Sequence, residues 1–234
     1  MGITLGIILG SGIELESSRT RDIKVLSSDN SGVHTKKKYT CVFEGHDILV
    51  LQGRKHFYEG YSYDKLTEDI KFIKKYGINH LVLTNAAGGV NCNFNVSDLM
   101  LIRSHVNLNS SLFYKRNPFP YDKKMAECFI SSCMDANVAL HEGVYGYYQG
   151  PTYETKAEVR FQKKFNIDAA GMSTIPESNE ANTLGIKVIA VSVITNILKE
   201  NDMEQASHES VINKAKAASL NLNKALSALI PQLN

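Results

Sequence analysis

Strand-like and helix-like segments alternate along this chain, and that alternation limits its fold more than any other feature. Residues 3–9 and 80–84 are continuous apolar runs, and residues 186–194 form the most β-branched stretch. Such runs are typical of strands that are buried on both faces of a sheet. Between two of these runs, Leu66 and Ile70 recur at helical spacing. The pattern predicts an α/β fold with a central mixed, largely buried β-sheet flanked by helices.

Turn and capping signals mark where these elements begin and end. Residues 39–43 and 47–51 flank a Glu-Gly-His turn, which is the pattern of a β-hairpin. Thr155 and Glu158 form a capping-box pattern, which opens a helix. The chain contains no Pro- or Gly-rich linker, no repeat and no low-complexity tract. The 234 residues are therefore expected to form a single domain, residues 1–234.

The composition argues against several broad classes of function. The formal net charge is only +2, and a near-neutral surface does not favour nucleic-acid binding by charge attraction. No apolar run approaches the roughly 20 residues that span a bilayer, and the N-terminus lacks the pattern of a signal peptide. The four cysteines form no CxxC pair, and no Cys/His cluster has metal-ligand spacing. We therefore expect a reduced, cytoplasmic protein with no metal site and no nucleic-acid or membrane partner.

Small and polar residues follow the strand-like runs, and ligands of α/β sheets bind beyond the carboxyl ends of strands. Ser11 lies in a Gly-Ser-Gly triplet directly after the first run, where the backbone can approach an anion and the hydroxyl can donate to it. A plain turn is the commoner reason for such a triplet. Arg54, His56 and Tyr58 follow the hairpin and fall on one face of an extended backbone. Because a guanidinium suits phosphate, this face is either a binding face or an exposed strand edge.

Three later parts of the chain add further polar groups at strand ends. Residues 85–89 are small and expose backbone N–H groups, which either cradle an anion or form a compact turn. Tyr153 and Glu154 place an aromatic ring beside a carboxylate before a helix, and the alternative is that Glu154 only caps that helix. Ser173 and Asn196 end two further strands. Together these groups supply anion donors, aromatic rings, a carboxylate and an amide, which suits phosphate plus a polar heterocycle.

The segments that carry these residues resemble, in order and spacing, those of the trimeric purine nucleoside phosphorylases of the 6-oxopurine type. They run through almost the whole chain and are GRKHFYEGYS, LVLTNAAGGVNCNFNVSDLMLIRSHVNL, GYYQGPTYET, AAGMSTIPE and VITN followed by His208. The resemblance implies a nucleoside phosphorylase-like fold and a pentosyltransferase that cleaves inosine, guanosine and their deoxy forms with inorganic phosphate. The products would be the purine base and (deoxy)ribose 1-phosphate, as in purine salvage. It also implies a homotrimer with no cofactor besides the co-substrate phosphate.

The resemblance implies a role for each matching position. Phosphate would be held by Ser11, His34, Arg54, His56, the backbone N–H of Ala86 and Ser173. The nucleoside would be bound by Tyr58, Tyr153, Glu154, Met172, Asn196 and His208. Within that set, Tyr58, Met172 and His208 would contact the ribose, and Tyr153 would stack on the purine. Glu154 would accept from the purine N1–H, and Asn196 would bond N7 and O6. Catalytic roles are implied for Asn196, His56 and Glu154.

The sequence departs from the family in residues 107–142, a stretch that is shorter than usual. In the family this stretch normally supplies an aromatic side chain to the site of the neighbouring subunit. Phe119 is the candidate for that contact.

Two alternative functions stay open. A methylthioadenosine phosphorylase shares the fold, but it usually carries Asp in place of Asn196 and a small residue in place of His208. A nucleoside-binding protein without turnover would need the purine contacts and not the phosphate set. The presence of that set in this sequence argues against a binding protein.

Overall fold

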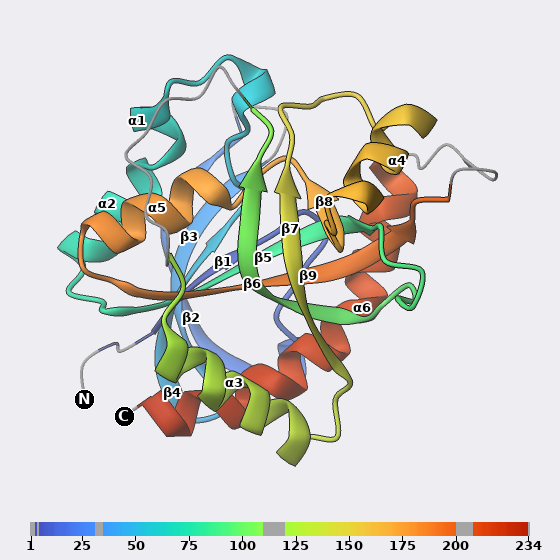
Figure 1. Cartoon of the computed structure of the whole chain (residues 1–234). Coiled ribbons are helices and arrows are strands. Elements are labelled where there is room, and N and C mark those ends of the chain that lie inside the picture. Colours follow the sequence, from blue (N-terminus) through green and yellow to red (C-terminus); the bar gives the residue numbers. More distant parts are fainter. Residues whose placement is uncertain (1–2, 4, 31–34, 110–119, 200–207, 234) are drawn as a thin grey trace.

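The strands of this protein form one mixed sheet. A computed structural model describes residues 3, 5–30, 35–109, 120–199 and 208–233 (Figure 1). Within these residues, nine strands pair in the order β2-β3-β4-β1-β5-β8-β7-β6-β9. The strands are β1 (Leu5–Leu9), β2 (Thr20–Asp29), β3 (Lys36–Phe43), β4 (His46–Gln52), β5 (His80–Gly89), β6 (Leu99–Asn107), β7 (Leu140–Tyr147), β8 (Ala169–Gly171) and β9 (Lys187–Ile197). The antiparallel pair β3–β4 confirms the predicted hairpin.

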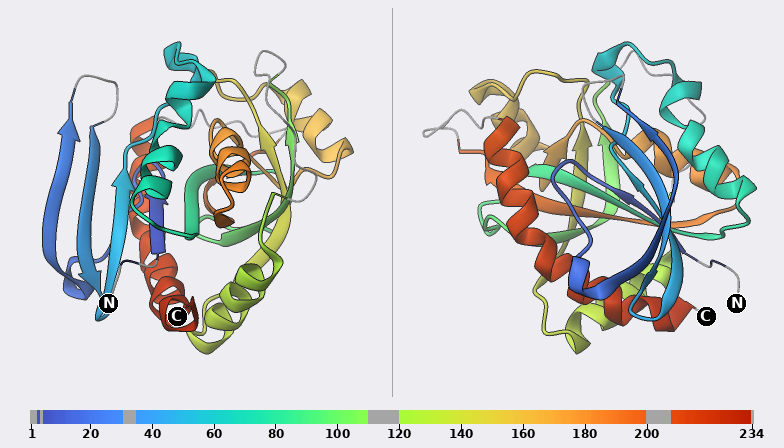
Figure 2. Two further views of the ribbon diagram at one scale, coloured as in Figure 1. Left: turned by 90° about the vertical axis from the view of Figure 1, so that its left-hand side faces the viewer. Right: turned by 180° about the vertical axis from the view of Figure 1, so that it is seen from behind.

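Part of this sheet closes on itself. β5 pairs in parallel with β1 and β9, and antiparallel with β8. β9 also pairs antiparallel with β6, and parallel pairings join β6 to β7 and β7 to β8. The ring β5-β8-β7-β6-β9 is therefore a small barrel, while β1, β4, β3 and β2 continue from it as an open sheet (Figure 2). The predicted α/β class with a mixed sheet is confirmed. The sequence analysis does not predict that part of this sheet closes into a barrel.

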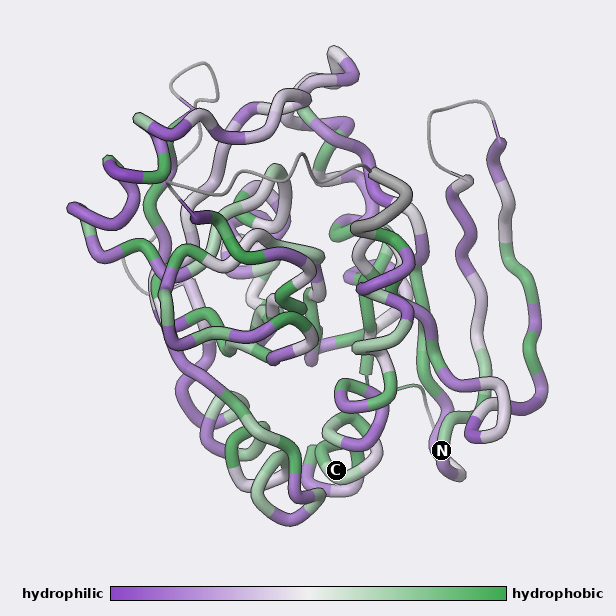
Figure 3. Tube along the Cα trace, turned by 90° about the vertical axis from the view of Figure 1, so that its right-hand side faces the viewer, coloured by the Kyte–Doolittle hydropathy of each residue, from purple (hydrophilic) through white to green (hydrophobic). Residues whose placement is uncertain are grey.

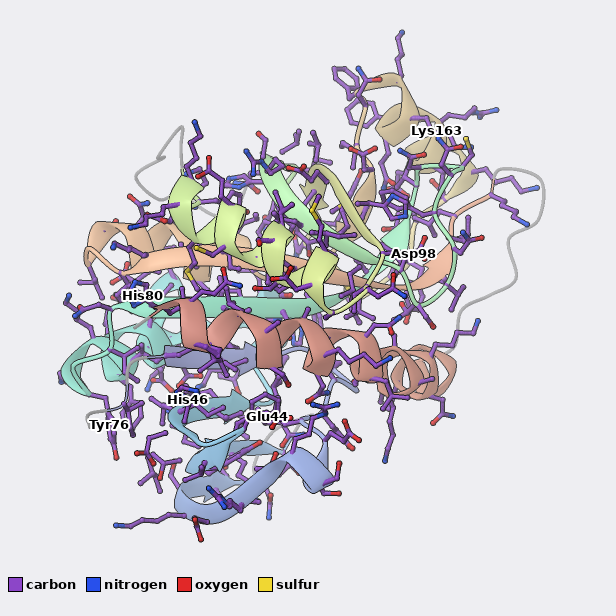
Figure 4. The ribbon with its side chains drawn as sticks, turned by 90° about the horizontal axis from the view of Figure 1, so that it is seen from below. Glu44, His46, Tyr76, His80, Asp98 and Lys163 are labelled. Carbon is purple, nitrogen blue, oxygen red and sulfur yellow. The ribbon has the colours of Figure 1, made fainter. Side chains whose placement is uncertain are left out.

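Helices cover both faces of the sheet and create two apolar cores. They are α1 (Tyr63–Leu66), α2 (Glu68–Lys75), α3 (Lys123–Asp135), α4 (Lys156–Lys164), α5 (Ile175–Thr183) and α6 (His208–Leu229), with short 3-10 helices η1 (Ser17–Arg19), η2 (Phe57–Glu59) and η3 (Ile230–Leu233). α3 and α6 lie side by side against one face (Figure 4), and α1, α2 and α5 lie together against the other. Along β1, Leu5, Ile7 and Leu9 pack in the first core, whereas Ile8 packs in the second. Burial on both faces explains why this strand reads as a continuous apolar run.

The structure corrects three local expectations. Residues 85–89 form no turn but continue β5 in register with β9, because strand pairing outweighs the turn preference of the two glycines. The helix expected through Leu66 and Ile70 is broken at Thr67 into α1 and α2. β2 was not predicted and is mostly exposed, so the sheet is less buried at this edge than expected. β2 carries both hydrophobic and hydrophilic residues (Figure 3), and the side chain of Ile23 is 55% exposed.

Candidate active site

A cavity of about 320 Å³ lies where the ends of β1, β4, β5, β8 and β9 meet. Its lining consists of Ser11, Arg54, His56, Tyr58, Ala86, Ala87, Gly88, Pro151, Tyr153, Glu154, Ala170, Gly171, Met172, Ser173, Thr195 and Asn196. Every predicted site residue whose side chain the structure describes lines this one cavity. His34 and Phe119 lie outside the described residues, and His208 begins α6 with a side chain that is also outside them. What each lining residue binds stays a prediction.

The glycines around Ser11 are explained by packing. A Cβ atom on Gly10 would lie 2.6 Å from the Cα of Asn85, and one on Gly12 would lie 2.6 Å from the carbonyl oxygen of Ile212. The N–H of Gly10 donates to the Thr84 hydroxyl at 3.0 Å. The triplet therefore lies where β1, β5 and α6 pack closely against one another. Of its three residues, Ser11 lines the cavity.

Arg54 is the buried cation of the cavity, with only 4% of its surface exposed. Its Nε donates to Glu177 Oε1 at 3.0 Å, and its Nη1 donates to the Thr84 carbonyl at 2.7 Å and to Ser173 Oγ at 3.2 Å. Nη2 is buried and finds no hydrogen-bond partner among the described residues. Because three contacts fix the guanidinium, its charge is held in place at the cavity wall, where it suits an anion such as phosphate.

Glu177 is a residue of this site that the sequence analysis does not single out. Its carboxylate accepts from Arg54 and, through Oε2, from the backbone N–H of Thr174 at 2.9 Å. Burial raises the pKa of Glu177, and the Arg54 guanidinium opposes that shift. The signal that would have found Glu177 is the need of a buried arginine for a counter-ion.

A strained turn aims Ser173 at Arg54. Thr174 has φ 81° and ψ −43°, a region that L-residues rarely adopt and that costs about 1–3 kcal/mol. Two contacts hold it there: the bond from its N–H to Glu177 and the bond from Asn85 Nδ2 to its hydroxyl at 2.9 Å. The turn places Ser173 Oγ 3.2 Å from Arg54 Nη1, so both donors face the same part of the cavity.

His56 and Tyr58 extend this polar wall. The His56 and Tyr58 rings stack with centroids 4.9 Å apart, and His56 Nδ1 lies 3.3 Å from Glu59 Oε1. Burial raises the pKa of Tyr58 to about 12, so its phenol stays protonated at neutral pH. The backbone is not extended throughout as predicted, because residues 57–59 form η2. Arg54, His56 and Tyr58 nevertheless line the main cavity together, whereas Lys55 and Phe57 line a separate, smaller pocket.

Glu154 and Tyr153 also line the cavity. The residue that caps α4 is Thr155, whose N–H donates to Glu158 Oε2 at 2.7 Å while the Glu158 N–H donates to Thr155 Oγ1 at 3.3 Å. The predicted capping box is thus confirmed, and it leaves Glu154 free of a capping role. Burial raises the pKa of the Glu154 carboxyl, and the charge of Glu158 adds to that rise. Tyr153 is 42% exposed at the rim.

Asn196 lies near the end of β9, where its side chain reaches the cavity. The Thr195 hydroxyl donates to Asn196 Oδ1 at 3.1 Å. Gly88 on β5 is paired with Asn196 on β9. A Cβ atom on Gly88 would lie 3.0 Å from the Leu198 side chain and 3.4 Å from Asn196 Nδ2. The glycine therefore keeps space beside the amide, which offers a donor and an acceptor to a ligand.

Metal-ligand clusters and membrane-spanning helices are both absent from the described residues. The described residues contain no group of three or more His, Cys, Asp or Glu that could hold a metal ion. None of the described helices is both long and apolar enough to cross a membrane.

Comparison with known proteins gives a consistent result. The family model described as "Phosphorylase superfamily" matches residues 4–231. Purine nucleoside phosphorylase 1 of Bacillus subtilis is 37% identical, with 96% of this chain and 91% of the relative covered. The Bos taurus purine nucleoside phosphorylase is 33% identical, with 98% and 89% covered. The crystal structure of Schistosoma mansoni purine nucleoside phosphorylase in complex with adenosine superimposes with a TM-score of 0.88 at 28% identity, covering 99% of this chain and 91% of that one. The complex of the Schistosoma mansoni enzyme with inosine gives a TM-score of 0.85 at the same identity and coverage. The chain therefore belongs to the purine nucleoside phosphorylases of the phosphorylase superfamily.

Proposed function

We propose that this enzyme cleaves 6-oxopurine nucleosides with inorganic phosphate, releasing the purine base and (deoxy)ribose 1-phosphate for purine salvage. Inosine, guanosine and their deoxy forms are the proposed substrates. The observation that carries the proposal is the composition of one cavity. A buried guanidinium, a carboxylate and an amide all line it, which suits an anion together with a polar heterocycle.

The proposed mechanism is electrostatic. Phosphate is held by Arg54 and Ser173 with Ser11, His56 and the backbone N–H of Ala86, and it approaches C1′ as the bond to N9 lengthens. The ribosyl group gains oxocarbenium character, which the bound anion stabilises. Negative charge appears on the departing purine, and the Asn196 amide stabilises it. Positioning and preorganised dipoles therefore supply the rate enhancement, and the enzyme forms no covalent intermediate.

The base end of the cavity favours a 6-oxopurine on hydrogen-bonding grounds. Glu154 accepts from N1–H and, in guanine, from the 2-amino group. Asn196 donates to O6 and accepts from a protonated N7. Adenine has no N1–H, and its 6-amino group is a donor where O6 is an acceptor. Adenine would therefore leave both side chains mismatched.

We expect inosine and guanosine to be cleaved at least about tenfold faster than adenosine in kcat/KM, because mismatched buried polar groups cost about 1–3 kcal/mol. The measurement is release of free base with phosphate present and with phosphate omitted. Adenosine and methylthioadenosine serve as the competing substrates. Equal turnover of either one would contradict the base assignment, and cleavage without phosphate would contradict phosphorolysis.

We also propose that the enzyme is a homotrimer, which is the state that the family resemblance implies. Phe161 on α4 and Phe165 at its C-cap support an association surface, since their exposed rings lie 4.5 Å apart. Light scattering is expected to give a mass near three times the 26.0 kDa of one chain. A fully active monomer would contradict the proposal.

A further inference from the structure

Thr84 on β5 is fully buried and does not line the cavity, yet it contacts two segments that do. Its hydroxyl donates to the Ile8 carbonyl at 3.1 Å and accepts from the N–H of Gly10 at 3.0 Å. Its own carbonyl accepts from Arg54 Nη1 at 2.7 Å. One residue therefore contacts both the backbone that leads into Ser11 and the guanidinium of the cavity.

The Thr84 hydroxyl lies where the backbone pairing of β1 with β5 stops. In that parallel ladder, residues Leu5–Ile8 pair with residues His80–Leu83. Gly10 lies beyond the last pair and is buried, so its N–H needs a partner inside the protein. The Thr84 side chain supplies that partner. It thereby extends the contact between the two strands into the turn that carries Ser11.

This contact brings the backbone of Gly10 against the next part of β5. A Cβ atom on Gly10 would lie 3.0 Å from the Thr84 carbonyl oxygen and 3.1 Å from the backbone nitrogen of Ala86. Ser11 follows Gly10 in the chain, and both Ser11 and Ala86 line the cavity. The way in which β1 is fastened to β5 at Thr84 therefore sets where the Ser11 hydroxyl lies relative to Ala86.

We propose that Thr84 is a positioning residue for phosphate. Its hydroxyl fixes the turn of Ser11 and its carbonyl fixes the guanidinium of Arg54, so that donors from two separate segments face one anion. Preorganised donors of this kind depend on the contacts that hold them in place. The inference rests on the proposed function, in which both groups bind phosphate. The Gly88–Asn196 pair belongs to the β5–β9 ladder and does not depend on the Thr84 hydroxyl.

The test variant is Thr84→Val, which keeps the β-branched shape and removes the hydroxyl. The backbone carbonyl stays, so Arg54 keeps its contact and only the turn of Ser11 is released. We expect the Kd of inorganic phosphate, measured by titration calorimetry without nucleoside, to rise about tenfold, because a displaced Ser11 loses a hydrogen bond to a charged ligand. The KM for phosphate is expected to rise with it, and the KM for inosine at saturating phosphate is expected to stay near the parent value. Thr84→Ser restores the hydroxyl and is expected to bind phosphate as the parent does.

The matched control is Thr67→Val. Thr67 is also fully buried, and its hydroxyl donates to the Tyr63 carbonyl at 2.9 Å outside the cavity. This variant is expected to lower the melting temperature and leave the Kd of phosphate unchanged. If Thr84→Val shows the same result as this control, Thr84 contributes only to stability and the inference is overturned.

A second pair of variants serves if Thr84→Val does not fold. Thr84→Cys and Thr84→Ser differ only in sulfur for oxygen, and a thiol is the weaker hydrogen-bonding group. The cysteine variant is therefore expected to bind phosphate more weakly than the serine variant, and equal affinities would overturn the inference. Failure of the proposed function gives a different result. A parent enzyme that binds no phosphate, or that cleaves inosine without it, would overturn the proposed function and this inference together.

Discussion

Arg54→Ala is expected to raise the KM for phosphate by at least about tenfold and to change the KM for inosine far less, because a charge-assisted contact worth about 1.5–3 kcal/mol is lost. Arg54 is a buried cation that lines the cavity, so its removal takes a charge-assisted contact from the anion. Steady-state kinetics with phosphate varied at saturating inosine measure the effect. An unchanged dependence on phosphate would remove Arg54 from the anion site.

The same variant has a second, separable effect on stability. Removing the guanidinium leaves Glu177 buried without its counter-ion, which typically destabilises a protein by about 3–5 kcal/mol. The pKa of Glu177 is already raised by burial and would rise further. When a carboxyl group has a higher pKa in the folded protein than in the unfolded one, its contribution to stability is fully present below the unfolded pKa. That contribution is lost as the pH rises through the folded pKa. The gap in melting temperature between variant and parent should therefore narrow at acidic pH.

Two further variants separate stability from phosphate binding. Arg54→Gln combined with Glu177→Gln replaces the ion pair by two neutral amides, so it should recover much of the stability and none of the phosphate affinity. Arg103→Ala is the matched control, because Arg103 forms an exposed ion pair with Glu142 at 3.2 Å. Exposed pairs contribute about 0–1 kcal/mol, so neither stability nor the KM for phosphate should change much.

The parts of the site that the sequence predicts are those set by local pattern. A buried strand reads as an apolar run, and the polar residue after it lies at the edge of the sheet where ligands bind. This reasoning placed Ser11, Arg54, Ser173 and Asn196 at strand ends, and the structure brings all four to one cavity. The capping box at Thr155 likewise depends on residues only three positions apart.

The parts that local pattern does not predict depend on contacts between distant residues. The barrel closes because β9 pairs with β5 through residues such as Ala190 and Leu83, which are far apart in the chain. The counter-ion of Arg54 is Glu177, and nothing near either residue signals the other. Gln162 looks like an ordinary surface residue of an amphipathic helix, yet it is fully buried. In each case burial is a property of the whole fold.

Asn196→Asp is expected to shift the ratio of kcat/KM for adenosine over inosine upward by about one to two powers of ten. The Thr195 hydroxyl donates to Asn196 Oδ1, which fixes that oxygen and leaves Nδ2 as the donor for O6 of the base. An ionised aspartate keeps the contact with Thr195 and loses the donor, so its second oxygen faces the lone pairs of O6 and repels them. The 6-amino group of adenine would meet an acceptor instead.

The competing explanation is that Asn196 only completes the end of β9. In that case the same substitution would lower activity on both nucleosides together or on neither, and the ratio would stay constant. Asn79→Asp is the matched control, because Asn79 is exposed and its Oδ1 accepts from Lys74 outside the cavity. A ratio that moves in Asn196→Asp and not in Asn79→Asp identifies the cavity amide as the group that reads position 6 of the purine. A constant ratio in both variants would instead leave the discrimination between oxo and amino bases to Glu154 alone.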